Sequence, residues 1–374
     1  MSARVLMATT IAMLVSLPVV AARNREPNDG RPSATVLCYH IVQSPQDPRM
    51  EISRDTFRQH LQYLEMTGYN VIPLRDLYEY VTGKRESIPD NAVVITIDDG
   101  WRSAYTEAFP ELKKRGFPFT LFVYPNIVNK TTVSVTWDQI REMQEGGADI
   151  QSHTFSHPYL TRRRQIDLDD EQYATWLRKE LVDSKKKIEK ETGRPVEFLA
   201  YPYGDFDTRV ATGVAKAGYA AALTCEAGRV RKGSDPFRMK RVVIDKTMDF
   251  AAFRSYMGAS AIELAELTPS PAKGSEPGQT VVSARIPGYA SLDPLSVGMA
   301  LLTLESVVPY AYDSKTGEIS LLLTESIKGD VHRAVVWARD AKSGKRVEGS
   351  WSFKLAQPTQ PAPQPQVAGA GGAP

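Results

Sequence analysis

The chain has 374 residues and contains little cysteine and little net charge. Two cysteines and five histidines are too few for a disulfide framework or a cysteine-rich zinc scaffold. The 46 lysines and arginines are balanced by 44 aspartates and glutamates, which leaves a net charge of +2. This balance argues against a nucleic-acid partner held by bulk charge. Hydrophobic residues make up 42% and charged residues 24%, which is ordinary globular usage and excludes wholesale disorder and collagen-like repeats.

Long apolar runs are also scarce, apart from one near the start. Residues 1–22 combine Arg4, an apolar run over Ile11–Val20 and small residues at its end, which predicts a signal peptide. The protein is therefore expected to be extracytoplasmic: periplasmic, in the cell envelope or secreted. An uncleaved membrane anchor is the alternative, although the run is shorter than the ~20 apolar residues that a spanning helix needs. A flexible leader is expected over 23–34.

Apolar strands and amphipathic helices alternate over residues 35–265, and the chain length suggests a second domain besides. Apolar strands that are each mostly followed by a helix indicate a parallel sheet covered on both faces, either a barrel or an open doubly wound sheet. The strands are predicted at Val36–Tyr39, Val93–Ile97, Phe119–Val123, Ala148–Gln151, Glu197–Ala200, Tyr219–Thr224 and Arg241–Ile244.

Chemically competent side chains gather where these strands end. In both parallel architectures the active site forms at the carboxyl edge of the sheet. The residues in question are His40, Asp98, Asp99, Tyr124, His153 and Tyr203.

Two local patterns carry the chemistry. In Asp98-Asp99-Gly100, neighbouring carboxylates at the end of a strand point to opposite faces and can take two separate tasks. The second pattern, Ser152 to His157, places two histidines four residues apart. Two histidines with one aspartate form a ligand set that leaves coordination positions open for water and substrate.

A different region follows residue 265. The stretch 266–278, rich in Pro, Gly and Ser, is the expected linker, and residues 279–356 are expected to form a small antiparallel β-sandwich-like domain. Strict alternation over Arg346–Leu355, with a partner strand at Val331–Ala338, supports this expectation. Residues 357–374 consist almost wholly of Pro, Gln, Ala, Gly and Val and are expected to be disordered.

The segment from Val36 to about Phe253 resembles the NodB-type polysaccharide deacetylases, carbohydrate esterase family 4, and within them the branch of poly-N-acetylglucosamine deacetylases. The family fold is a distorted (β/α) barrel, which agrees with the strand count. The resemblance is carried by Leu37 to His40, Asp98 to Gly100, Trp137 with Asp138, Ser152 to His157, and Pro202 to Gly204.

The resemblance implies a metal-dependent hydrolase that removes N-acetyl groups from an N-acetylglucosamine-containing polysaccharide. Asp99, His153 and His157 would bind a divalent ion, most readily Zn²⁺, which lowers the pKa of a bound water. Asp98 would be the general base, and the backbone N–H of Tyr203 would stabilise the oxyanion. The implied partner is an acetylated glycan, with no nucleic acid and no membrane span once the signal is cleaved.

Two positions depart from the family pattern. Ala200 stands where many members carry an arginine that orients the base, so Asp98 is expected to lack that partner. Residues Lys240–Ile244 contain no histidine to serve as the general acid, so the acid is unassigned. His40, at the same edge of the sheet, is a catalytic candidate, and a structural hydrogen-bonding role is the alternative. Sugar-binding contacts are expected from Tyr39, Trp101, Tyr124, Trp137 and Pro202.

Three alternatives stay open at this stage. The departures from the family pattern are compatible with a non-catalytic glycan-binding protein on the same scaffold. A metal-dependent amidase acting on peptidoglycan would use the same ligand set. Cys38 and Cys225 are either bonded in an oxidising compartment or are two buried thiols.

Overall fold

The computed structural model describes residues 32–43, 50–161, 167–258, 260–270, 280–302, 308–323 and 331–354. The expected signal peptide, nearly all of the leader, most of the linker and the tail lie outside these residues. Two boundaries differ from expectation. The first strand begins at Ser33, inside the expected leader, and a strand that ends at Thr268 extends into the expected linker.

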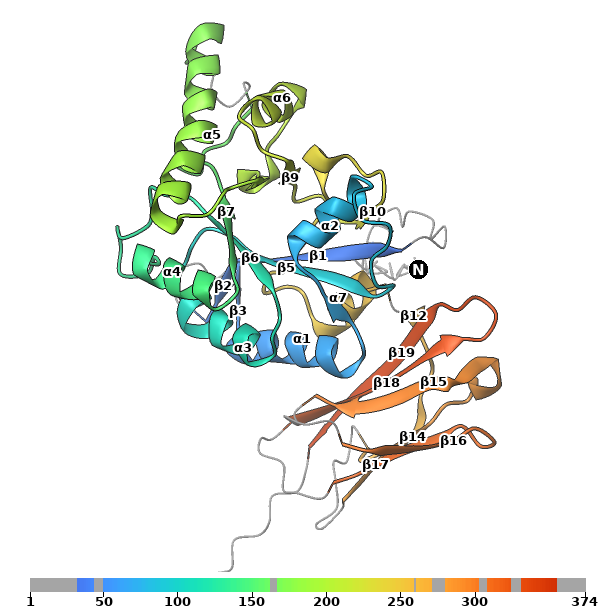
Figure 1. Ribbon diagram of the computed structural model, residues 1–374. Helices are drawn as coiled ribbons and strands as arrows, with labels where there is room; N and C mark the ends of the chain where they lie inside the picture. Colours follow the sequence, from blue (N-terminus) through green and yellow to red (C-terminus); the bar gives the residue numbers. More distant parts are fainter. Residues whose placement is uncertain are drawn as a thin grey trace, which may run out of the picture. The chain divides into compact units, whose positions relative to one another are not determined.

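A curled, mainly parallel sheet forms the first part of the chain (Figure 1). Its strands follow the order β10-β1-β5-β6-β7-β8-β9, with β11 beside β1 and β4 beside β5. The strands are β1 Ser33–Tyr39, β4 Asn70–Val71, β5 Ala92–Ile97, β6 Phe119–Val123, β7 Asp149–Ser152, β8 Phe198–Ala200, β9 Ala221–Leu223, β10 Arg229–Arg231 and β11 Val242–Val243. A separate short pair joins β2 Ile41–Val42 to β3 Glu51–Ile52.

The helices lie around this sheet (Figure 1). Many of them begin at a residue whose side chain accepts a hydrogen bond from the backbone of the first turn. Ser53 caps the first helix and Thr136 the fourth, each accepting a backbone N–H of the first turn. The helices are α1 Arg54–Met66, α2 Leu74–Val81, α3 Phe109–Lys114, α4 Trp137–Glu145, α5 Asp170–Thr192, α6 Thr208–Lys216 and α7 Phe250–Tyr256, with a π-helical stretch at Ala104–Ala108 before α3.

Two four-stranded sheets form the last part of the chain, with the orders β12-β19-β18-β15 and β13-β14-β17-β16. They enclose a separate hydrophobic cluster that includes Val282, Ile319 and Trp351. The expected distorted barrel followed by a small antiparallel β-sandwich is thus confirmed. The strands are β12 Ser260–Ala261, β13 Ala265–Thr268, β14 Val281–Arg285, β15 Leu292–Leu301, β16 Tyr310–Asp313, β17 Glu318–Leu322, β18 Val331–Asp340 and β19 Arg346–Lys354.

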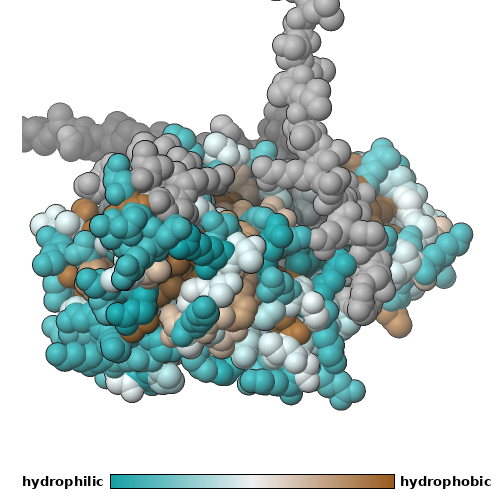
Figure 2. All heavy atoms as spheres, turned by 90° about the horizontal axis from the view of Figure 1, so that it is seen from above, coloured by the Kyte–Doolittle hydropathy of each residue, from teal (hydrophilic) through white to brown (hydrophobic). Residues whose placement is uncertain are grey.

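On the face drawn in Figure 2, hydrophilic side chains predominate and apolar ones are scattered among them. Among the described residues no helix combines the length and hydrophobicity that a membrane crossing requires. Cys38 and Cys225 are both free thiols in this structure, so no disulfide joins them.

Candidate metal and catalytic centre

Three predicted metal ligands converge at the carboxyl edge of the parallel sheet. Asp99 follows β5, and His153 and His157 lie in the loop after β7. The Oδ1 atom of Asp99 is 3.4 Å from Nε2 of His153 and 3.3 Å from Nε2 of His157, and the two Nε2 atoms are 3.1 Å apart. These spacings are close to the ~3.3 Å expected between ligands of a tetrahedral ion with bonds of ~2.0–2.1 Å.

The donor atoms also have the lone pairs that a cation needs. His153 Nδ1 lies 2.8 Å from the carbonyl oxygen of Ala200, which only accepts hydrogen bonds. Nδ1 therefore carries the proton, and Nε2 keeps its lone pair. Asp99 Oδ1 is buried and, apart from its close approach to the two histidines, has no hydrogen-bond partner among the described residues, while Oδ2 accepts a bond from the Trp101 indole at 3.0 Å. The three residues fit a divalent cation.

The backbone at this site adopts left-handed conformations that place the ligands. Asp99 has φ +74° and His157 has φ +61°, which are uncommon for residues other than glycine. Gly100 has φ +81°, and a Cβ atom there would lie 2.8 Å from a methyl group of Val123. The glycine of the Asp-Asp-Gly turn is therefore required by close packing as well as by conformation.

Asp98, the predicted base, is buried beside a guanidinium that the sequence analysis missed. Arg241 Nη1 donates to Asp98 Oδ1 at 2.8 Å, and both residues are at most 1% exposed. Arg241 Nε donates to the carbonyl of Thr224 at 2.9 Å, which fixes the guanidinium. The expectation that Asp98 lacks an arginine was therefore wrong. The arginine comes from just before β11, 143 residues along the chain, instead of from position 200.

Electrostatics keep both aspartates ionised. Burial by itself would raise the pKa of Asp98, but Arg241 and the nearby histidines outweigh it, so the pKa lies below its ordinary value. Burial likewise opposes ionisation of Asp99, and the two ligand histidines lower its pKa well below the usual range.

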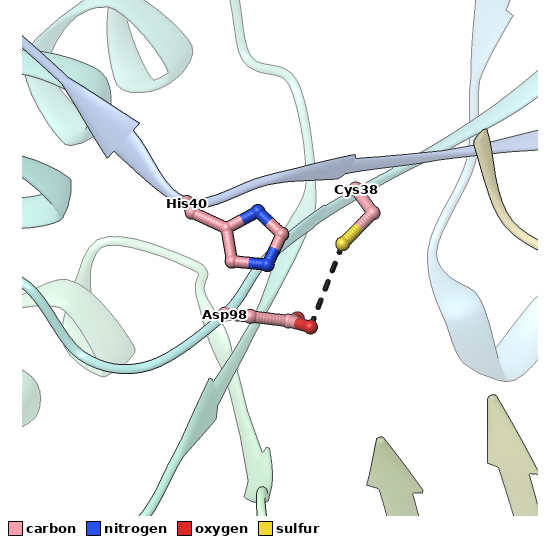
Figure 3. Close-up of side chains that lie close together, drawn as sticks. All are labelled: Cys38, His40 and Asp98. Carbon is pink, nitrogen blue, oxygen red and sulfur yellow. Dashed lines mark hydrogen bonds between the residues drawn. The ribbon is translucent and has the colours of Figure 1, made fainter. Parts of the chain in front are cut away.

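His40 lies next to this pair at the end of β1. Its ligand-capable nitrogen, the Cys38 sulfur and an Asp98 oxygen lie within 4.8 Å of one another (Figure 3). The Cys38 thiol donates to Asp98 Oδ2 at 3.5 Å. Because Arg241 already neutralises Asp98, this second group does not favour a further cation. Burial lowers the pKa of His40, although Asp99 and Asp98 oppose that shift.

The turn at Pro202–Gly204 places Tyr203 at the mouth of the site. Tyr203 has φ +59°, and its ring centroid is 4.6 Å from that of His157. The side chain is 55% exposed, while Pro202 is buried.

The predicted sugar-binding aromatics separate into two groups. Tyr124 is half-buried with its ring 5.1 Å from that of His157, so it borders the site, and Trp101 holds Asp99. Tyr39 is 1% exposed, and its hydroxyl pairs with His60, so no sugar reaches it. Trp137 is 7% exposed at the start of α4, where Lys187 covers its ring at 5.7 Å. Tyr39 of β1 and Trp137 of α4 both belong to the hydrophobic core, which explains why their rings are buried.

Helix α5 holds the histidine loop through residues that were not predicted. The Glu180 carboxylate accepts the backbone N–H groups of Phe155 at 3.0 Å and of Ser156 at 2.9 Å, and the Ser156 hydroxyl at 2.7 Å. Ser184, one turn later, donates to the carbonyl of Thr154 at 2.8 Å. The sequence did contain an indication of this role, because Glu180 and Ser184 are polar residues on the otherwise apolar face of the expected helix.

Comparisons with known proteins agree with this geometry. Residues 85–222 match the family model described as polysaccharide deacetylase. YxkH of Bacillus subtilis is 27% identical over 222 residues, covering 59% of this chain and 75% of that protein. The poly-beta-1,6-N-acetyl-D-glucosamine N-deacetylase of Staphylococcus epidermidis is 25% identical over 233 residues, covering 57% of this chain and 79% of that protein.

Solved structures share the fold of the first part of the chain. The structure of IcaB from Ammonifex degensii is 27% identical, with a TM-score of 0.55, and covers 61% of this chain and 98% of that one. The Streptococcus pyogenes deacetylase PplD is 23% identical with a TM-score of 0.54, covers 60% of this chain and 98% of that one, and supports the fold alone. In its curled parallel sheet, the first part of this chain is similar to the polysaccharide deacetylases.

Proposed function

We propose that this protein is a metal-dependent hydrolase that removes N-acetyl groups from an N-acetylglucosamine-containing polysaccharide and releases acetate. One observation carries the proposal. Three ligand atoms, Asp99 Oδ1 and the Nε2 atoms of His153 and His157, converge within 3.4 Å of one another beside the ion pair of Asp98 and Arg241. The relatives named as deacetylases supply the substrate class.

The cofactor is a divalent cation held by Asp99, His153 and His157, and we propose Zn²⁺. Two imidazoles and one carboxylate form a donor set that zinc commonly takes in hydrolases. When bound there, the cation polarises the acetamide carbonyl and lowers the pKa of the attacking water.

The remaining steps are assigned to side chains of this chain. Asp98, kept ionised by Arg241, accepts the proton of the attacking water. The backbone N–H of Tyr203 donates to the oxyanion that forms as the carbonyl is attacked. His40 gives a proton to the departing amine and receives one from Asp98, its close neighbour. The bond between the carbonyl carbon and nitrogen breaks, leaving acetate and a free amino sugar.

The proposal extends to location and to the other parts of the chain. Because acetylated polysaccharides of this kind lie outside the cytoplasm, we propose extracytoplasmic action after cleavage of a signal at residues 1–22. We also propose that the chain consists of a catalytic domain, a linker and an accessory β-domain. The binding-only alternative loses one of its two motives, since Asp98 does have an arginine partner, whereas Lys240–Ile244 contains no histidine.

The decisive experiment is acetate release by wild type, Asp98→Asn and a control, Asp138→Asn, whose side chain is exposed on α4. The substrates are poly-β-1,6-N-acetylglucosamine, chitin oligomers and peptidoglycan, and metal content is measured in parallel. We expect Asp98→Asn to lose about 10²–10⁴-fold in kcat, since it lacks the base, and to retain its metal. The proposal fails if wild type binds no metal and releases no acetate from any of these glycans. Peptide cleavage detected by mass spectrometry would instead identify an amidase.

A further inference from the structure

Two exposed aromatic rings stand beside the metal centre. Tyr159 is 40% exposed and Tyr203 is 55% exposed. The other large hydrophobic side chains recorded as exposed among the described residues all lie in the C-terminal sheets: Val281, Leu295, Tyr310 and Leu322. Tyrosine combines an apolar ring with a polar hydroxyl, so two exposed tyrosines beside a candidate active site are suited to contact a ligand.

The two rings form an ordered row that starts at a metal ligand. Tyr159 and Tyr203 stack with centroids 4.1 Å apart and planes 18° apart. Tyr203 in turn meets His157 edge to face, with centroids 4.6 Å apart. The row therefore begins at a candidate metal ligand, and both of its tyrosine rings are exposed.

The loops that carry the two tyrosines are tied together by a buried carboxylate. Asp205, directly after the turn that carries Tyr203, accepts the Thr161 backbone N–H at 2.8 Å and its hydroxyl at 3.1 Å. Leu160, next to Tyr159, is fully buried, and its carbonyl accepts the Tyr173 hydroxyl at 2.9 Å. The rings are thus held in place before any ligand arrives, which lowers the entropic cost of binding.

From this arrangement we infer that Tyr159 and Tyr203 form a platform that binds the sugar unit next to the one whose acetyl group is removed. The inference rests on the proposed function. A β-linked pyranose presents an apolar face of C–H groups, which packs against an aromatic ring, while its hydroxyls reach water or the phenol oxygens. In this arrangement, the unit next to the one at the Tyr203 N–H would pack against these rings.

The test compares Tyr159→Ala with Tyr159→Phe, which keeps the ring, and with Tyr310→Ala, which removes an equally exposed tyrosine from the C-terminal sheets. Tyr159 is chosen because Tyr203 has a left-handed backbone that substitution would disturb. The measured quantity is the ratio of kcat/KM for a β-1,6-linked N-acetylglucosamine pentamer to that for the monosaccharide. We expect this ratio to fall about tenfold in Tyr159→Ala, as for the loss of ~1.4 kcal/mol, and to stay within twofold of wild type in the other two variants.

Direct binding separates this inference from the proposed function. The Kd of the pentamer is measured in the Asp98→Asn background with and without Tyr159→Ala, and metal content confirms that His157 is undisturbed. A roughly tenfold weaker Kd supports the platform even if no glycan is hydrolysed. An unchanged Kd and an unchanged kcat/KM ratio would overturn it. Equal losses on monosaccharide and pentamer would also overturn it, since they would place Tyr159 at the reaction centre.

Discussion

At the scale of single residues, the pair formed by Asp98 and Arg241 decides whether the base is charged. A fully buried carboxylate is costly unless it is paired and hydrogen-bonded. Arg241 supplies the pairing, and Cys38 donates a further bond to the same carboxylate. The charge needed for catalysis is therefore stabilised by contacts in the core of the sheet, away from solvent.

Replacing Arg241 is expected to be costly for stability and for rate. Arg241→Met leaves Asp98 buried without a counter-charge and should lower the free energy of unfolding by about 3–5 kcal/mol. Arg241→Lys keeps the positive charge, but a single ammonium group cannot reproduce the guanidinium geometry that reaches both Asp98 and the Thr224 carbonyl. We therefore expect an intermediate loss of stability and of rate. Urea unfolding and acetate release measure both effects.

The control is Arg238→Met, because Arg238 is half-exposed and its ion pair with Glu226 lies at the surface. Exposed pairs contribute about 0–1 kcal/mol. Wild-type stability in Arg241→Met would contradict the role given to this ion pair.

At the scale of elements, α5 is the support of the histidine loop. Its buried face carries Glu180 and Ser184 one turn apart, and these two side chains hold the backbone from Thr154 to Ser156. The loop contains left-handed residues at Thr154 and His157, which persist only where the surroundings fix them. The helix thus determines where the imidazoles point.

Glu180→Gln is expected to weaken metal binding without unfolding the protein. The amide oxygen can still accept the two backbone N–H groups, but the negative charge that strengthens these bonds is lost, and the NH₂ group can only donate to Ser156. Loss of such supporting contacts typically costs 10–100-fold in metal affinity, which competition with a chelator measures.

The matched control for this prediction is Glu189→Gln on the same helix. Glu189 also accepts a backbone N–H, from Val196 at 3.0 Å, but far from the histidine loop in sequence. Equal metal affinity in Glu180→Gln and wild type would show that α5 does not position the ligands.

At the scale of the whole molecule, the C-terminal sheets and the parallel sheet share buried contacts. Tyr63 of α1 donates to Glu348 of β19 at 2.5 Å, and Glu348 is 1% exposed. Leu302 and Val335 belong to the same hydrophobic cluster as the residues under the parallel sheet. Arg333 of β18 also lies close enough to His60 of α1 to affect its ionisation.

His60 is expected to make the stability of the whole chain pH-dependent. Burial, with a smaller contribution from Arg333, lowers the pKa of His60 to about 3. The unfolded chain binds a proton below pH ~6.5 and the folded chain does not, so stability is lost as the pH falls through that value. The free energy of unfolding should fall by up to about 1.4 kcal/mol per pH unit on this account.

His60→Gln removes the titrating group, and its urea unfolding curves between pH 7 and pH 4 are the measurement. We expect a shallower dependence on pH than in wild type, together with a lower stability at pH 7 from the lost stacking on Phe253. Identical slopes in the two proteins would show that His60 is not kept neutral in the fold.

The sequence by itself determined the parallel sheet and the β-sandwich, and it pointed to the three proposed metal ligands. Apolar strands of a parallel sheet end at a common edge, so Asp98, Asp99 and His153 could be placed together from the order of the strands alone. The helices could be located from the spacing of apolar residues and from the glycines that follow them, because these signals are local in the sequence.

Only the tertiary structure decided which distant side chains complete the site. Arg241 meets Asp98 across 143 residues, and Glu180 reaches the histidine loop from the neighbouring helix. Tyr159 stacks on Tyr203 because two separate loops turn toward each other. No period or motif encodes such pairs, because they depend on the curvature of the sheet and on the packing of elements that are far apart in the chain.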